Sequence, residues 1–142
     1  MSALAPLLSP FSWPVRVYWE DTDAGGIVFY ANYLKFFERA RTEWLRERGV
    51  EQAQLRAQTG GMFVVSEAHV RYYHSARLDD ELIVTAVPTA VGRASMTLSQ
   101  QAFLKKGADP LLLCEATVRV GWINADRHQA ARIPSTLLDA LR

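Results

Sequence analysis

The chain has 142 residues, which is enough for one domain with a proper hydrophobic core. Its basic and acidic side chains nearly balance, with a formal net charge of +1, and they are scattered along the chain; the composition therefore excludes a basic footprint for nucleic acid or an anionic membrane. The single cysteine, Cys114, excludes an intrachain disulfide and fits a reducing compartment.

The first twelve residues are expected to form an irregular arm. They are apolar but lack a basic start, and Pro6 and Pro10 interrupt them, so they do not have the pattern of a signal peptide. They are also too short to span a bilayer. Residues 1–142 therefore indicate a single cytoplasmic domain with this arm at its start, no transmembrane segment, no internal repeat and no linker.

The beginning of the domain is predicted to be a strand that ends in an acidic loop. Residues 15–19 alternate and are rich in strand-forming side chains, which is typical of a strand. Residues 20–28 are expected to form the loop, in which Asp21 and Asp23 stand just before the paired Gly25 and Gly26.

Residues 30–48 are predicted to form the one long helix of the chain. Apolar side chains recur three and four positions apart, which is the period of an amphipathic helix. Gly49 suits the left-handed position that ends helices, and the polar residues 51–61 are expected to contain a short helical turn. The side chains expected on the buried face are Tyr33, Leu34, Phe37, Ala40, Trp44 and Leu45.

After Gly61 the period of the pattern changes to two, which predicts four long strands with one apolar face each. Pro134 and Ser135 open a short closing helix. A run of strands beside a single long helix predicts an α+β domain, an antiparallel sheet with the helix on its buried face. The strands are expected at residues 62–72, 81–91, 94–104 and 112–122; in the first of them, Met62, Val64, Ala68, Val70 and Tyr72 are expected to share a face.

The acidic loop carries the chemistry that the residues alone suggest. It holds a carboxylate next to the N-terminus of a helix, where backbone N–H groups lack intrahelical partners. A carboxylate can attack a carbonyl or activate water, and N–H groups can stabilise an oxyanion. The alternative is that Asp21 and Asp23 only cap the loop or the helix.

Other reactive side chains do not form a recognisable site. His69 and His74 stand five apart on a predicted strand and so face opposite sides, and His128 lies in a distant loop; no metal site is expected. Cys114 lies on the apolar face of its strand, which favours a buried structural thiol over a nucleophile. The sequence has neither a nucleophile elbow nor a phosphate-binding loop.

A family resemblance enters at residues 13–33, which read W-P-V-R-V-Y-W-E-D-T-D-A-G-G-I-V-F-Y-A-N-Y. They resemble the opening of the hotdog-fold acyl-CoA thioesterases of the 4-hydroxybenzoyl-CoA thioesterase superfamily. Within it they look most like the YbgC-type enzymes associated with the Tol–Pal envelope system. The similarity continues through E-R-A-R-T-E-W-L-R and V-V-S-E-A-H-V-R-Y-Y-H-S-A-R-L-D-D and covers about residues 13–133.

The resemblance implies a hotdog fold and hydrolysis of an acyl-CoA thioester to free acid and CoA. Asp23 matches the catalytic carboxylate of the family, as nucleophile or general base, and Asp21 is left with a loop-fixing role. Tyr30 matches the position whose backbone N–H polarises the thioester carbonyl. Arg93 matches a basic position near the CoA phosphates, although a solvated turn arginine is an equal alternative. The family implies a homodimer or homotetramer and no cofactor, because CoA is part of the substrate.

Two positions depart from the family pattern. Tyr30 stands where many YbgC-type members carry His, and Ser75 stands where the family usually has Pro. The rival functions are a thioesterase for acyl carrier protein or for aromatic acyl-CoA, and a non-catalytic acyl-binding or scaffold protein of the envelope system. A hotdog dehydratase fits less well, because the loop lacks the catalytic His of that group.

Overall fold

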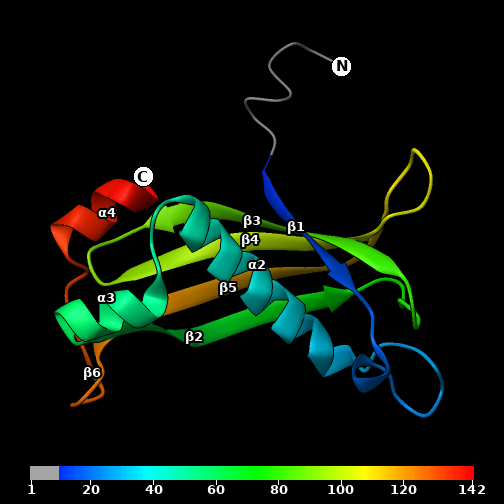
Figure 1. The fold of residues 1–142 in the computed structure, drawn as a ribbon, viewed down its shortest axis with the longest axis horizontal. Helices are drawn as coiled ribbons and strands as arrows, with labels where there is room; N and C mark the ends of the chain where they lie inside the picture. The colour runs from blue at the N-terminus through cyan, green and yellow to red at the C-terminus, as the bar shows by residue number, and fades with distance from the viewer. Residues whose placement is uncertain (1–9) are drawn as a thin grey trace.

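A long helix, α2 (Tyr33–Glu47), lies across one face of an antiparallel sheet (Figure 1). The computed structural model describes residues 10–142. The short 3-10 helices η1 (Trp19–Asp21) and η2 (Tyr30–Asn32) precede α2, and the helices α3 (Gln52–Thr59) and α4 (Ser135–Leu141) follow it. This arrangement confirms the predicted α+β hotdog fold, with the sheet wrapped around one central helix.

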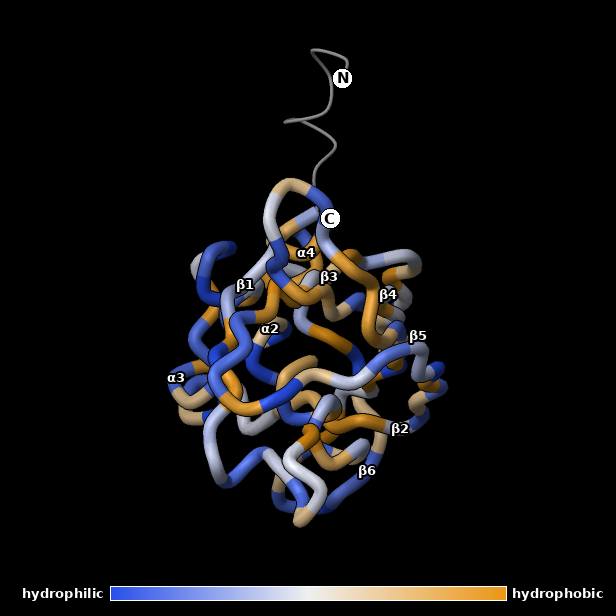
Figure 2. Tube along the Cα trace, turned by 90° about the vertical axis from the view of Figure 1, so that its right-hand side faces the viewer, coloured by the Kyte–Doolittle hydropathy of each residue, from blue (hydrophilic) through white to orange (hydrophobic). Residues whose placement is uncertain are grey.

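The sheet is antiparallel throughout, with the strand order β1-β3-β4-β5-β2 and the short β6 paired with β5. β1 and β2 are therefore the outer strands of this order. In Figure 2, hydrophobic segments of β2, β3 and β4 appear in orange. The strands are β1 (Phe11–Arg16), β2 (Gly61–Tyr72), β3 (Glu81–Val91), β4 (Ser95–Leu104), β5 (Leu111–Asn124) and β6 (Gln129–Ala130).

The first strand begins and ends earlier than predicted. Phe11 and Ser12, expected in the irregular arm, pair with β3, whereas residues 1–9 of that arm lie outside the described residues. Pro14 fits inside β1 because an edge strand leaves one row of backbone groups unpaired. Beyond Arg16 the chain leaves the ladder, and Trp19 starts η1 with 76% of its surface exposed, so its strand-forming side chain misled the prediction.

Five of the six side chains predicted on the buried face of the helix are buried, and Leu34 is the exception. Leu34 is 42% exposed, whereas Phe36, which was not predicted to be buried, is fully buried. With 3.6 residues per turn, Leu34 lies about 100° round the helix from the buried Tyr33, at the margin of the stripe that faces the sheet. Gly49 follows the helix at a φ of +79°, the conformation predicted for it.

A bulge in β2 overturns half of the face predicted for this strand. Its register with β5 shifts between Val65 and Glu67, so Ser66 is an extra residue. Phe63 lies opposite the buried Trp122, and beyond the bulge Tyr72 lies opposite the buried Cys114, which places both on the helix side. Met62 and Val64 therefore lie on the outer face. One inserted residue reverses the alternation, and the two-residue period gave no sign of it.

The remaining predicted elements are confirmed with small changes of their ends. The polar segment after the helix forms α3, which is longer than the single turn expected, and α4 begins at Ser135 directly after Pro134. Leu137 and Leu141 bury one side of α4 in the core. Across the described residues, no helix is long and apolar enough to cross a membrane.

Candidate active site

The acidic loop forms a closed turn at one end of the sheet. Thr22 and Val28 form an isolated bridge, and the Asp23 N–H donates to the Ile27 carbonyl at 2.8 Å. Inside this turn the Gly26 N–H donates to the Asp23 carbonyl at 3.1 Å. Gly26 has a φ of +81°, which other residues rarely adopt, so the turn requires glycine there.

Asp21 connects this loop to the strand before it and the helix after it. Its side chain is 1% exposed, and Oδ2 accepts a hydrogen bond from the Tyr18 N–H at 2.8 Å. Its carbonyl oxygen accepts two more, from the Phe29 N–H at 3.0 Å and from the Asn32 Nδ2 at 2.9 Å. Asp21 therefore fixes the base of the loop, while Asn32 ties it to the start of the helix.

Asp23 presents its carboxylate at the exposed side of the loop. Oδ1 accepts hydrogen bonds from the Gly25 N–H at 2.8 Å and the Ile27 N–H at 3.4 Å. Oδ2 accepts no hydrogen bond from residues 10–142. One oxygen thus closes the turn, as the capping alternative predicts, and the other is left for water or a substrate.

Tyr30 is the first residue of η2, so its backbone N–H stands at a helix start. No oxygen of the described chain accepts a hydrogen bond from it. The tyrosine ring is 63% exposed and packs against Phe29 and Tyr72, with ring centroids 4.9 and 5.9 Å apart. The structure thus brings the Asp23 carboxylate and the Tyr30 N–H into one loop, although the α-helix proper starts only at Tyr33.

Arg93 lies far from Asp23 within one chain. The acidic loop contacts the segment before β3, where the Val28 N–H donates to the Ala76 carbonyl at 2.9 Å. Arg93 follows β3 at the opposite end, and its carbonyl accepts a hydrogen bond from the Ile133 N–H at 2.7 Å. The 11 residues of β3 separate the two ends by about 36 Å. Figure 1 shows the acidic loop at the right and the turn after β3 at the left.

The other reactive side chains lie apart. His69 is exposed and contacts Glu67 at 2.8 Å, and among residues 10–142 no group of three His, Cys, Asp or Glu side chains could hold a metal ion. Cys114 is fully buried, as predicted, and burial raises the pKa of its thiol to about 12. At neutral pH it is therefore a thiol and not a nucleophilic thiolate.

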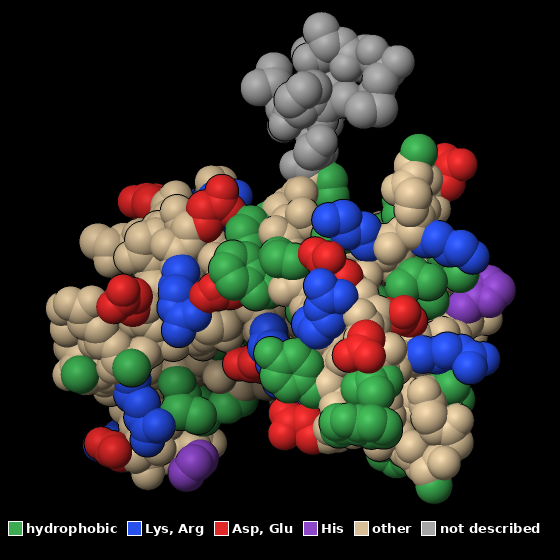
Figure 3. Space-filling view, turned by 45° about the vertical axis from the view of Figure 1, so that its right-hand side comes forward, with side chains coloured by type: hydrophobic (Ala, Val, Ile, Leu, Met, Phe, Trp, Pro, Cys, Tyr) green, Lys and Arg blue, Asp and Glu red, His purple; other side chains and the backbone are tan. Residues whose placement is uncertain are grey.

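Exposed aromatic side chains surround the acidic loop. Hydrophobic and charged side chains are interspersed over the right-hand side of the molecule, which carries the loop (Figure 3). The large hydrophobic side chains exposed next to the loop or the start of α2 are Tyr18, Trp19, Phe29, Tyr30, Leu34, Tyr72 and Tyr73.

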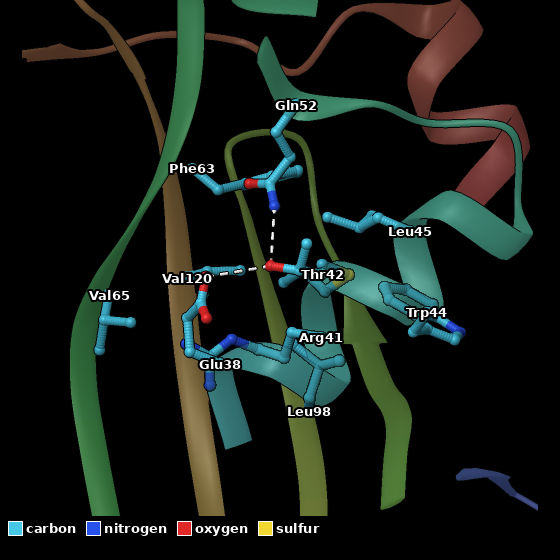
Figure 4. Close-up of a pocket in the computed structure, with 11 residues that line it drawn as sticks. Glu38, Arg41, Thr42, Trp44, Leu45, Gln52, Phe63, Val65, Leu98 and Val120 are labelled. Atoms are coloured by element: carbon cyan, nitrogen blue, oxygen red, sulfur yellow. Dashed lines mark hydrogen bonds between the residues drawn. The ribbon is translucent and has the colours of Figure 1, made fainter. Parts of the chain in front are cut away.

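A cavity of about 160 Å³ lies between α2 and the first half of β2 (Figure 4). The sheet supplies an apolar floor, and α2 and α3 supply polar side chains. The Gln52 Nε2 donates to the Thr42 hydroxyl at 3.2 Å, and this hydroxyl donates to Glu38 at 3.0 Å. The lining residues are Glu38, Arg41, Thr42, Trp44, Leu45, Gln52, Phe63, Val65, Met96, Leu98 and Val120.

The sequence prediction included no residue of this cavity among the candidate site residues, and Arg41 is one of those it missed. Its Nη1 donates to the Gln100 Oε1 at 3.0 Å, and burial lowers the pKa of its guanidinium. Gln100 is fully buried between Leu98 and Ala102 on the apolar face of β4. A polar residue at such a position requires hydrogen-bond partners, so the glutamine was the available signal.

Comparison with known proteins assigns the chain to a family. A family model described as the thioesterase-like superfamily matches residues 17–141. The acyl-CoA thioester hydrolase YbgC of Escherichia coli is 41% identical over 128 residues, which cover 90% of this chain and 92% of that protein. The acyl-CoA thioesterase YbgC of Haemophilus influenzae is 40% identical over 124 residues, with 87% and 88% covered.

Solved structures agree on the fold. A 4-hydroxybenzoyl-CoA thioesterase complexed with 4-hydroxybenzoyl-CoA superposes with a TM-score of 0.86 at 19% identity, with 92% of this chain and 97% of that chain covered. That likeness concerns the fold, whereas the sequence identities concern the family. The chain belongs to the thioesterase-like superfamily and, within it, to the YbgC-type acyl-CoA thioesterases.

Proposed function

We propose that this protein hydrolyses an acyl-CoA thioester to a free acid and CoA. The observation that carries the proposal is the acidic loop, in which Asp23 has one carboxylate oxygen fixed and the other open, with the Tyr30 N–H at the helix start beyond it. The thioester carbonyl oxygen accepts a hydrogen bond from this N–H, which stabilises the negative charge that develops on it. The names of the relatives support the same activity.

Two routes use the same carboxylate. In the first, the Asp23 oxygen attacks the carbonyl carbon, the C–S bond breaks to release CoA, and water then hydrolyses the mixed anhydride. In the second, Asp23 takes a proton from water, the hydroxide attacks, and the C–S bond breaks in the same way. A single turnover in water labelled with oxygen-18 separates them, because label in the enzyme carboxylate excludes the general-base route.

A second copy of the chain completes the site in this proposal. The acidic loop lies at the Tyr72 end of β2, and the cavity lies at the Phe63 end, about 30 Å along the same strand. Antiparallel pairing of two β2 edges about a twofold axis brings the loop of one copy to the cavity of the other. It also covers an exposed edge of 12 residues, which an isolated copy leaves open to aggregation. The acyl group then occupies the cavity of the second copy.

The experiment is release of CoA thiol from a panel of short, long, branched and benzoyl acyl-CoAs by wild type and Asp23→Asn. The variant is expected to lose activity by orders of magnitude while keeping its fold. Turnover that survives in folded Asp23→Asn would contradict the assignment of the carboxylate. Binding of acyl-CoA without turnover by wild type would favour a non-catalytic acyl-binding protein.

The carrier of the acyl group needs a separate comparison. The same acyl group is offered as its CoA thioester and as its acyl-carrier-protein thioester. A strong preference for the second would make the protein an acyl-carrier-protein thioesterase.

A further inference from the structure

The peptide unit between Phe29 and Tyr30 carries the proposed oxyanion donor, which is the Tyr30 N–H. The carbonyl of this unit accepts a hydrogen bond from the Asn32 N–H at 2.8 Å. The N–H itself donates to no oxygen of residues 10–142. An oxyanion donor is effective because its direction is set before the reaction, so the side chains that hold this peptide unit in place affect the rate.

The ring of Tyr72, the last residue of β2, packs against the ring of Tyr30. The two ring centroids lie 5.9 Å apart at 87°, which is the edge-to-face arrangement that aromatic pairs prefer. The same Tyr72 ring contacts Tyr33, with centroids 5.8 Å apart at 62°. Tyr72 therefore contacts the first residue of η2 and the first residue of α2, and Figure 1 shows the arrowhead of β2 near the start of α2.

Tyr33 gives this cluster of three tyrosines a fixed support. It is buried, and its hydroxyl accepts a hydrogen bond from the Ala76 N–H at 3.0 Å. Its ring also packs edge-to-face on the fully buried Phe36, with centroids 5.8 Å apart. The Tyr30 ring is largely exposed instead, so the contact with Tyr72 links it to the rigid core.

The ring of Tyr72 supplies this link, and its hydroxyl is not needed for it. Burial raises the pKa of the Tyr72 phenol above its ordinary value, so the hydroxyl is uncharged at neutral pH. A phenolate at this position would place a second negative charge near the one that develops on the thioester oxygen. The neutral ring therefore suits a place beside the oxyanion donor.

We propose that Tyr72 is a positioning residue of the oxyanion site, whose ring holds the Tyr30 side chain and thereby sets the direction of the Tyr30 N–H. This inference rests on the thioesterase function proposed above and deepens it. In this role Tyr72 acts through Tyr30 and needs no contact with the thioester. Its loss should therefore lower the rate of the chemical step more than the binding of the substrate.

The test compares variants of Tyr72 in the release of CoA thiol. Tyr72→Leu removes the ring contact and is expected to lower kcat about tenfold, which is less than the 10²–10³ typical of a lost oxyanion donor, with KM changed by less than about twofold. Tyr72→Phe keeps the ring and is expected to retain the wild-type kcat. The matched control is Tyr73→Leu, because Tyr73 is the next residue, is also exposed and donates its hydroxyl to Glu115.

Tyr30→Pro shows whether Tyr72 acts through Tyr30 and its N–H. Proline lacks this N–H and fits the first position of a helix. Phe29 already has the extended conformation that a residue before proline prefers, with φ −61° and ψ 129°. In the Tyr30→Pro background, Tyr72→Leu is expected to lower kcat no further, because no donor is left to be positioned.

Three results would overturn the proposal. The first is a further tenfold loss of kcat from Tyr72→Leu in the Tyr30→Pro background. The second is a Tyr72→Leu variant with the kcat of wild type, and the third is a Tyr72→Phe variant as slow as Tyr72→Leu. The third result would assign the effect to the hydroxyl in place of the ring.

An infrared measurement separates this inference from the thioesterase proposal, and it decides the matter if Tyr30→Pro does not fold. The best-bound member of the acyl-CoA panel, labelled with carbon-13 at its thioester carbonyl, is bound to Asp23→Asn. A hydrogen bond from the Tyr30 N–H polarises the carbonyl and lowers its stretching frequency. Adding Tyr72→Leu is expected to reduce this lowering, whereas adding Tyr72→Phe is expected to leave it unchanged.

The outcomes of this measurement are distinct. The expected frequencies without turnover of any thioester by wild type would refute the thioesterase while keeping the role of Tyr72. Equal frequencies with and without Tyr72→Leu, in a protein whose wild type turns over the thioester, would overturn the role of Tyr72 while the thioesterase stands.

Discussion

The hydrogen bond from Asn32 to the Asp21 carbonyl offers a test of how the acidic loop is positioned. It joins the base of the loop to the start of the helix at 2.9 Å, and the chain segment that it closes contains both the Asp23 carboxylate and the Tyr30 N–H. Asn32→Ala removes this bond while the Phe29 N–H still occupies the same carbonyl. The expected loss of stability is about 1 kcal/mol, as for one partly buried hydrogen bond.

The effect on catalysis should exceed the effect on stability. A displacement of about 1 Å between reacting groups can cost a hundredfold in rate, so a tenfold to hundredfold fall in kcat is expected with little change in KM. Urea unfolding measures the stability, and thiol release measures the rate. Thr22→Val is the matched control, because it removes an exposed hydrogen bond of 2.9 Å to the Trp19 carbonyl in the same loop without touching the helix.

A double-mutant cycle decides whether Asn32 acts through the carboxylate. If it positions Asp23, its removal should cost little once Asp23→Asn is present, because nothing remains to be positioned. Equal losses of kcat in both backgrounds would refute this reasoning. An unchanged kcat in Asn32→Ala together with the expected loss of stability would leave the bond with a structural role alone.

Three further predictions concern packing, the buried amide and the thiol. Gly61→Ala should destabilise the fold by about 1–3 kcal/mol in urea unfolding, because a Cβ there would lie 2.2 Å from the Trp122 ring, whereas Gly121→Ala, with open space, is the control. Gln100→Met should cost about 1–3 kcal/mol, because it removes a fully buried amide that accepts a hydrogen bond from Arg41 and donates to the Phe37 and Thr85 carbonyls. Since the folded pKa of Cys114 is raised from 9.0 to about 12, its contribution to stability is complete below pH 9 and is lost as the pH rises toward 12. Urea unfolding from pH 8 to 11 should therefore show a steeper decline in wild type than in Cys114→Ala.

Each of these has a contradicting result. Equal stabilities of the two glycine variants would show that the Trp122 ring moves aside without cost. A Gln100→Met variant as stable as wild type would show that the three hydrogen bonds of the Gln100 side chain contribute nothing to the free energy of unfolding. Parallel pH profiles of wild type and Cys114→Ala would mean that the thiol titrates alike in the folded and unfolded chain.

Long regular patterns were predictable and local irregularities were not. The buried and less buried side chains of β5 alternate from Cys114 to Trp122, and the predicted ends of β3 and β5 lie within two residues of those observed. The face predicted for the part of β2 before Ser66 was wrong. A bulge depends on the pairing with another strand, so the alternation of apolar residues in the sequence does not reveal it. The prediction of a strand at residues 17–19 was wrong for a related reason. Their side chains are typical of strands, but the Asp21 carboxylate accepts a hydrogen bond from the Tyr18 N–H and stabilises a turn there.

In the candidate site, too, the local part could be predicted from the sequence and the tertiary part could not. The acidic loop is a local feature, so Asp23, the glycines and the helix start could be found by reading along the chain. The cavity is a tertiary feature, because Arg41 and Gln100 are 59 residues apart and meet only when the helix packs on the sheet. Arg93 was found by its match to a family position, but such a match does not predict the distance between Arg93 and Asp23. Within one chain, Arg93 lies at the end of the sheet away from Asp23.

The same separation argues that pairing of two chains assembles the site. Within one chain, the open oxygen of Asp23 faces the exposed side of a loop, and the cavity lies about 30 Å away along β2. Neither part alone can hold a thioester at its carbonyl and at its acyl end. If the twofold arrangement is right, a mixed dimer of Asp23→Asn chains and chains whose cavity is filled by Thr42→Phe has one site with both native parts and one with neither. It should recover about half of the wild-type activity per dimer. If each site came from one chain, every site of the mixed dimer would lack one residue and no recovery would follow.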